Sequence, residues 1–352
     1  MCAVVATAWR RFSLSPSEGE RAGVRGRGPM QFVVGIGFML FLSLVPARAA
    51  VFTEDFTSPP AARGWRVFGD GSLFTWNPTN ETLDVTWDSA RPNSYFFRPL
   101  GTILGKSDDF AFQFELRLHS IQPGANPAKP WTFEIAVGLF RVDSATDAAF
   151  SRGTGRDSPN LVEWDYFPAA DIIEATVSPV IVSTNSQFIA GFSYPLEMPV
   201  NDLFRVALAY TASNQTLVTT MARNGAPFGP IQSVRLPVSF TDFRVDSFSI
   251  SSYNDAGDEL GSILARGDID NIVVTTPAPP LESLAIRITN GLARVQFAGR
   301  TNWSYTLQRS VDLTNFASVQ TVSSPVSTNV VLEDPSVAAV TNRFYRVRAD
   351  RP

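Results

Sequence analysis

The chain has almost none of the residues that support thiol or imidazole chemistry. Its 352 residues include one Cys, Cys2, and one His, His119. We expect Cys2 to be lost with an N-terminal leader, which excludes disulfides, thiol catalysis and cysteine-based zinc sites. A Ser-His-Asp triad would have to use His119, and metal sites that need several histidines are excluded.

A basic region is also missing. The formal net charge is −4, and residues 1–50 hold six Arg and two Glu, so the remaining chain has 23 basic and 31 acidic residues, a charge of −8. An acidic chain without a basic patch argues against nucleic acid as a partner. Hydrophobic residues make up 44% and charged residues 18%, which is typical of a globular protein.

The sequence has one long hydrophobic run, Phe32–Val45, which is too short for a good membrane span. Ala47–Ala49 (ARA) has the small-x-small form of a signal-peptidase site. We interpret residues 1–50 as an upstream extension followed by a signal peptide that starts at Met30 and is cleaved near Ala49. An uncleaved anchor is the alternative. The expected location is extracellular or the cell envelope, with no integral membrane span in the mature chain.

Amphipathic helical periodicity is absent beyond about two turns. The clearest pattern is instead the alternation of apolar and polar residues over Phe110–His119, which predicts a strand. It places His119 on the polar face, where we interpret it as a solvated residue. The sequence predicts an all-β fold, a sandwich or jelly roll. Further strands are predicted at Thr82–Asp88, Trp131–Val142, Asn160–Pro168, Phe204–Thr211, Gln215–Arg223, Asp246–Tyr253 and Asp268–Thr275.

The proline-rich stretch TTPAPP predicts a linker at residues 277–280, because proline stiffens the chain and cannot pair in a sheet. The predicted organisation is a first domain at 51–276 and a small second β-sandwich at 281–352. Strands are expected in the second domain at Leu284–Thr289, Leu292–Phe297, Ser304–Ser310, Val330–Glu333 and Phe344–Arg348.

One predicted strand, Asn160–Pro168 (NLVEWDYFP), combines carboxylates with apolar residues. Strand alternation puts Glu163 and Asp165 on one face and Trp164 and Tyr166 on the other. Burying two carboxylates requires a cation, a hydrogen-bond network or a groove that contains water. We therefore expect a ligand groove beside Glu163 and Asp165.

Three segments of the first domain resemble the concanavalin A-like lectin and glucanase superfamily. Asn160–Phe167 is similar to the V-E-F-D strand of L-type lectins, whose Glu and Asp hold manganese and calcium. Phe204–Met221 is similar to their strand-turn-strand, and Val238–Asp255 to a late strand that leads into a ligand-side loop. The resemblance implies a jelly roll that binds carbohydrate.

The lectin metal site is not intact in this sequence. Ala169 stands where L-type lectins have an Asn, and Pro179 stands where they have the His of the manganese shell. Two alternatives follow: a calcium site, or a carboxylate pair satisfied by backbone and Arg groups. The metal ligands that the resemblance implies are Glu163, Asp165, Asp171 and Glu174.

The same superfamily includes laminarinase-like glycoside hydrolases, whose catalytic strand reads E-x-D-x-E. The resemblance would make Glu163 the nucleophile and Asp165 the supporting acid. The acid/base position is Phe167, or Pro168 with one insertion, and neither side chain donates a proton. A hydrolase would need an acid from another strand. The candidates for it are Glu134 and Glu115.

Aromatic side chains near the acidic strand are suited to stacking on sugar rings. If the acids line the groove, Trp164 and Tyr166 are core residues; if the acids bind a structural ion, the roles could reverse. The loop NDAGDELG, Asn254–Gly261, is interpreted as solvated, with a calcium site as the alternative. The predicted ligand-binding residues are Glu163, Asp165, Trp131, Trp164 and Tyr166.

Tyr305–Phe316 and Arg343–Asp350 resemble the small β-sandwich at the end of many secreted proteins of environmental bacteria, similar to a fibronectin type III module. The predicted function is secreted, non-catalytic binding of a polysaccharide. The alternatives are a glycan-cleaving enzyme on the same fold and a structural cell-surface protein without a small ligand.

Overall fold

The structure is a computed structural model that divides the chain into two compact units. The first unit contains residues 48–280, and the second contains residues 281–350 together with strand β1 (Ala3–Ala6). The structure describes residues 3–6, 50–153, 158–170, 173–258, 260–277, 282–289, 292–299, 303–313, 315–324, 329–335 and 343–350.

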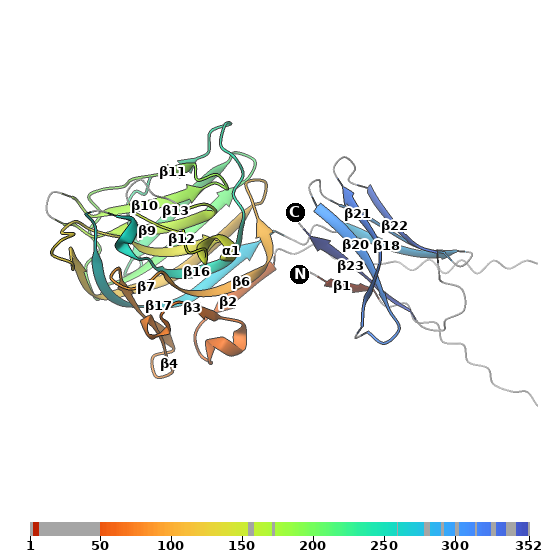
Figure 1. Ribbon diagram of the computed structural model, residues 1–352, viewed down its shortest axis with the longest axis horizontal. Coiled ribbons are helices and arrows are strands. Elements are labelled where there is room, and N and C mark those ends of the chain that lie inside the picture. Colours follow the sequence, from red (N-terminus) through yellow and green to blue (C-terminus); the bar gives the residue numbers. More distant parts are fainter. Residues whose placement is uncertain are drawn as a thin grey trace, which may run out of the picture. The chain divides into compact units, whose positions relative to one another are not determined.

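The first unit consists of two antiparallel sheets, which we call the front and back sheets (Figure 1). In spatial order, the front sheet contains β11 (Phe188–Ala190), β10 (Thr176–Val182), β9 (Leu161–Phe167), β8 (Ile135–Phe140), β16 (Val245–Ser252), β6 (Ser94–Leu104) and β3 (Arg66–Phe68). The back sheet contains β14 (Ala226–Phe228), β13 (Thr216–Arg223), β12 (Leu203–Thr211), β7 (Phe110–Pro123), β17 (Ile263–Thr276), β5 (Thr82–Asp88) and β4 (Phe74–Asn77), with β15 (Val234–Arg235) on β13 and β2 (Ala50–Glu54) on β17.

The core lies between these sheets because each buries the apolar face of its alternating strands. Phe112 and Phe114 of β7 are buried, and their rings lie 5.7 Å from Phe248 and 5.6 Å from Trp164 of the front sheet. The fold is thus the predicted all-β jelly-roll sandwich. The helices within the described residues are single turns: α1 (Val142–Ala145), η1 (Pro60–Arg63), η2 (Gly71–Leu73) and η3 (Asp255–Gly257).

Strand bounds follow the sequence pattern where one face is polar. β5 has the predicted bounds, and β7 begins at Phe110 as expected. The strand predicted at Trp131–Val142 is shorter: β8 covers Ile135–Phe140, and Val142 begins α1. Within the described residues, no helix is long and apolar enough to cross a membrane.

The second unit is a small β-sandwich with its own core. One sheet has the order β18 (Glu282–Thr289), β19 (Leu292–Ala298), β22 (Asn329–Asp334), and the other β1, β23 (Phe344–Asp350), β20 (Trp303–Ser310), β21 (Ala317–Ser324). Phe297 of β19 and Tyr305 of β20 join the sheets through rings 4.9 Å apart. Its likeness to a fibronectin type III module stays a prediction.

Candidate functional site

A pocket of about 660 Å³ lies on the face of the front sheet that points away from the core. Strand β9 gives it Asp165 and Phe167, while β10 gives it Thr176 and Ser178. The pocket combines apolar and charged groups. Its aromatic residues are Trp131, Phe167, Phe188 and Phe192, and its charged residues are Glu134, Arg152, Asp165 and Asp258.

Small residues on neighbouring strands make room for the carboxylates. Asp165 stands between Ala136 of β8 and Ser178 of β10 in the register. Gly138 of β8 lies opposite Glu163, and a Cβ at this glycine would stand 2.6 Å from the Glu163 Cα. Only glycine lets the two strands approach this closely beside a large acidic side chain.

Four buried charged side chains meet beneath the pocket, and we call them the charge centre: Arg152, Glu134, Glu163 and Asp165. Each is at most 3% exposed. The Arg152 Nε lies 3.2 Å from Glu134, and its Nη2 lies 3.3 Å from Glu163 and donates to Asp165 at 2.9 Å. Three carboxylates therefore share one guanidinium, whose planar fork suits several acceptors.

A tyrosine that follows β16, two strands away from β9, supports the charge centre. The Tyr253 hydroxyl, just beyond β16, donates to Glu163 Oε1 at 2.5 Å. Burial, together with the nearby Glu163 charge, raises the pKa of Tyr253 well above its ordinary value. The phenol therefore stays protonated and remains a donor to this carboxylate. The Arg152 guanidinium also lies 5.4 Å from the centre of the Tyr253 ring.

The predicted ligand-binding residues separate into three groups. Asp165 and Trp131 line the pocket, whereas Glu163 is completely buried beside Arg152. Trp164 and Tyr166 are also 0% exposed, because they lie on the core face of β9. Trp164 and Tyr166 therefore pack in the core and do not contact a ligand in the pocket. This is the arrangement expected if the acids of β9 face the groove.

The predicted metal ligands that the structure describes do not gather around a common centre. Arg152 pairs with Glu163 and Asp165, Glu174 is exposed, and Asp171 lies outside the described residues. Among the residues that the structure describes, no group of three or more His, Cys, Asp or Glu side chains is arranged to hold a metal ion. A guanidinium against these carboxylates does not fit the metal pair of the lectin resemblance.

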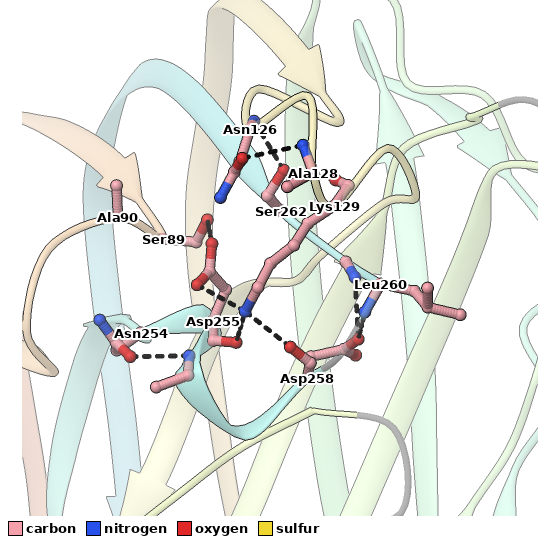
Figure 2. Close-up of polar contacts among 12 residues, drawn as sticks. Ser89, Ala90, Asn126, Ala128, Lys129, Asn254, Asp255, Asp258, Leu260 and Ser262 are labelled. Atoms are coloured by element: carbon pink, nitrogen blue, oxygen red, sulfur yellow. Dashed lines mark hydrogen bonds and ion pairs between the residues drawn. The ribbon is translucent and has the colours of Figure 1, made fainter.

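The loop expected to be solvated is instead tied to a lysine (Figure 2). Asp255 and Asp258 are each 8% exposed. The Lys129 ammonium donates to the Asp255 carbonyl oxygen at 2.5 Å, to Asp255 Oδ1 at 3.0 Å and to the Asp258 carbonyl oxygen at 2.7 Å. We call Asp255–Asp258 the pocket turn, since Asp258 lines the pocket.

The other titratable candidates lie on the back sheet. His119 forms an ion pair with Asp268 of β17, and both line a separate polar groove of about 810 Å³. Glu115 pairs with Arg205 of β12. Glu115 therefore does not complete a catalytic set with Asp165, whereas Glu134 reaches the charge centre. Sequence reasoning missed Arg152, which lies outside the strands in a segment without periodicity.

No protein-family profile matches the chain, and no curated protein is found to be similar in sequence. Solved structures that resemble it include peanut lectin, 16% identical, with a TM-score of 0.43 over 66% of this chain and all of the lectin. Ulex europaeus lectin II, complexed with galactose, is 14% identical, with a TM-score of 0.42 over 64% of this chain and 98% of the lectin. An alginate lyase is 11% identical, with a TM-score of 0.38 over 59% of this chain and 86% of the lyase. Likenesses this distant say nothing about a ligand.

Proposed function

We propose that the first unit binds a saccharide in the front-sheet pocket without cleaving it. The observation that carries this proposal is the pairing of aromatic rings with buried charged groups in one cavity. Phe188 and Phe192 are 41% and 51% exposed at the pocket, and Trp131 is half-buried there. Sugar C–H faces stack on such rings, while carboxylate and guanidinium groups fix hydroxyls by hydrogen bonds.

The arrangement of the acids supports binding rather than hydrolysis. Retaining and inverting glycosidases both need one carboxyl group that donates a proton. Glu134, Glu163 and Asp165 all lie against the Arg152 guanidinium, where carboxylates act as acceptors. Phe167 stands at the acid/base position of the hydrolase pattern and also lines the pocket.

A glycan-cleaving enzyme is the second candidate, favoured by one observation. Glu134, from the segment before β8, meets Asp165 at the same guanidinium and lines the same pocket. It is an acid from another part of the sheet, as a hydrolase on this strand would require. In this version of the function, Arg152 would have to release one of the two carboxyl groups in the complex with substrate.

The test compares two exposed phenylalanines at opposite edges of the front sheet. Phe188→Ala removes a pocket residue from β11, and Phe68→Ala is the matched control on β3, 38% exposed. Purified protein is titrated with a panel of soluble polysaccharides, and reducing ends are measured in the same samples. We expect Phe188→Ala to weaken binding about tenfold, the value of one aromatic stack, and Phe68→Ala to have no effect.

Each other outcome rejects one part of the proposal. New reducing ends that disappear in Glu134→Gln would make the protein an enzyme. Equal loss of binding in both phenylalanine variants would place the ligand outside the pocket. No binding to any polysaccharide on a broad panel would leave the structural-protein alternative.

We also propose that the protein is secreted. The support is the hydrophobic run Phe32–Val45 followed by the ARA site at Ala47–Ala49. N-terminal sequencing of protein recovered from culture medium is expected to begin near Val51. Protein that keeps residues 1–50 in the membrane fraction would contradict cleavage.

A further inference from the structure

The Lys129 ammonium is enclosed by oxygen atoms in the way that a bound cation would be. Its three acceptors are two backbone carbonyls and one carboxylate oxygen, at 2.5–3.0 Å. An ammonium has three N–H donors, so each donor has one acceptor. Carbonyl and carboxylate oxygens are also the ligands that hard cations prefer. Lys129 is one of only two lysines in the sequence.

The pocket turn connects this ammonium to the pocket wall. Asp258 Oδ1 accepts from the backbone N–H of Leu260 at 2.8 Å (Figure 2). The same oxygen accepts from the Gly261 N–H, also at 2.8 Å. The Leu260 carbonyl in turn accepts from the Trp131 N–H at 2.8 Å. Asp258, Gly261 and Trp131 all line the pocket. The Lys129 ammonium is therefore connected to three pocket residues through a short chain of hydrogen bonds.

Two glycines in this part of the pocket wall pack so closely against neighbouring backbone that no larger residue would fit there. A Cβ on Gly261 would lie 2.4 Å from the Thr132 carbonyl oxygen, and one on Gly257 would lie 2.5 Å from the Arg152 carbonyl oxygen. Gly257 of the pocket turn therefore fits directly against the backbone at Arg152, and Gly261, hydrogen-bonded to Asp258, fits against the backbone beside Trp131. A shift of the turn would move Asp258 and Gly261 together.

We propose that Lys129 is a positioning residue whose ammonium serves as a built-in cation for the pocket wall. It holds the two carbonyls and the carboxylate of the pocket turn, so the pocket forms without a bound metal ion. The metal pair of the lectin resemblance does not fit the charge centre, where Arg152 lies against the carboxylates. Lys129 is a second side chain that supplies positive charge beside the pocket. The effect on saccharide binding rests on the proposed function, whereas the effect on the turn does not.

The first test measures the turn itself by hydrogen exchange of the full chain. Lys129→Met keeps the apolar stem and removes the ammonium. Lys106→Met is the matched control, because the Lys106 ammonium also donates to a carbonyl oxygen, that of Phe240, and does not line the pocket. We expect the amides of Asp258, Leu260 and Gly261 to exchange about tenfold faster in Lys129→Met and to be unchanged in Lys106→Met.

Wild-type protection of these amides in Lys129→Met would overturn the proposal. If Lys129→Met unfolds, Lys129→Arg replaces it, since a planar guanidinium keeps the charge but cannot place three donors on the same oxygens. Faster exchange restricted to the same amides is then expected. Unchanged protection in Lys129→Arg would equally overturn the proposal.

The second test uses chemical rescue of the truncated variant Lys129→Ala. Added n-propylammonium, which matches the three carbons and the nitrogen that alanine lacks, is expected to restore protection of the turn, and n-propanol, of similar shape without charge, is expected to have no effect. Equal rescue by both would assign the role to packing and overturn the proposal. Where wild-type protein binds a polysaccharide, its affinity should be the same in EDTA and in calcium. An EDTA-sensitive wild type would also overturn it, whereas a wild type without binding would reject only the proposed function.

Discussion

Each unit buries acidic and basic side chains together, but the contacts among the described residues differ between the two. In the first unit three carboxylates share Arg152. In the second unit one carboxylate, Asp334, has three donors: Arg309 at 3.0 Å, Arg343 at 3.3 Å and the Tyr345 hydroxyl at 2.9 Å. Asp334 is 0% exposed, as is Glu163 in the first unit.

Access to solvent also separates the two groups. The side chain of Arg309 is 39% exposed, so the excess positive charge of the second unit extends into water. The charge centre has no member above 3% exposure, and Glu134, Arg152 and Asp165 of this group line the pocket. The charged cluster of the second unit is thus partly open to water, whereas the charge centre of the first unit is buried beside a pocket.

Removing Arg152 should have the largest effect. Arg152→Met leaves three buried carboxylates without their shared cation, which typically costs about 3–5 kcal/mol. We expect the first unit to lose about this much free energy of unfolding, and saccharide binding with it, in urea titrations followed by unit-resolved hydrogen exchange. Arg205→Met is the control: its side chain is 64% exposed beside Glu115, and such a pair contributes less than about 1 kcal/mol. Equal effects in the two variants would remove the distinction drawn here.

The next largest effect is expected at Tyr253. Tyr253→Phe keeps the ring and removes the donor to Glu163, which should cost about 2 kcal/mol because a buried carboxylate oxygen loses a partner. Urea titration of the first unit measures the loss. Tyr95→Phe is the matched control, as its buried hydroxyl donates to the Ala145 carbonyl and not to a charged group. A smaller loss in Tyr253→Phe than in Tyr95→Phe would contradict a charge-centre role for Tyr253.

In the second unit, Asp334→Asn should cost about 2 kcal/mol, less than Arg152→Met. The amide oxygen still accepts one hydrogen bond, and Arg309 can turn toward water. Urea titration reports the stability change, and saccharide affinity of the same protein should match the wild type. A loss of stability larger than that of Arg152→Met would contradict the expected order of the two charged clusters.

The sequence predicted the fold better where strands have one polar face. The alternation at Phe110–Leu118 was correct because β7 has one face in the core and one face with polar residues. Strands β6 and β10 were missed because they lack this signal. In β10, six of seven residues are buried, so side chains on both faces are covered, and Pro179 stands within the strand.

The sequence pointed to some residues around the pocket and not to others. Two carboxylates on one face of Asn160–Pro168 pointed to Glu163 and Asp165, and Trp131, another predicted ligand-binding residue, lines the same pocket as Asp165. Arg152 and Lys129 lie in irregular segments, where spacing carries no information about which acid they meet. Their partners come from distant parts of the chain, so only the folded arrangement identifies them.

A carboxylate without a guanidinium shows what the cation contributes. Asp270 of β17 accepts from the Asn271 amide at 3.0 Å, and its pKa is raised to about 6 by burial and by nearby acids. The folded protein therefore holds this proton up to about pH 6, whereas the unfolded chain releases it near 3.8. Stability from this group is present below pH 4 and is lost as the pH rises through 6.

Asp270→Asn should accordingly raise the melting temperature at pH 8 and not at pH 3.5. The corresponding gain in free energy of unfolding at pH 8 should stay below about 1 kcal/mol, since Asp270 is partly exposed and solvent screens its charge. A gain of the same size at both pH values would show that the amide acts through packing, and the comparison with the arginine-paired acids would then fail.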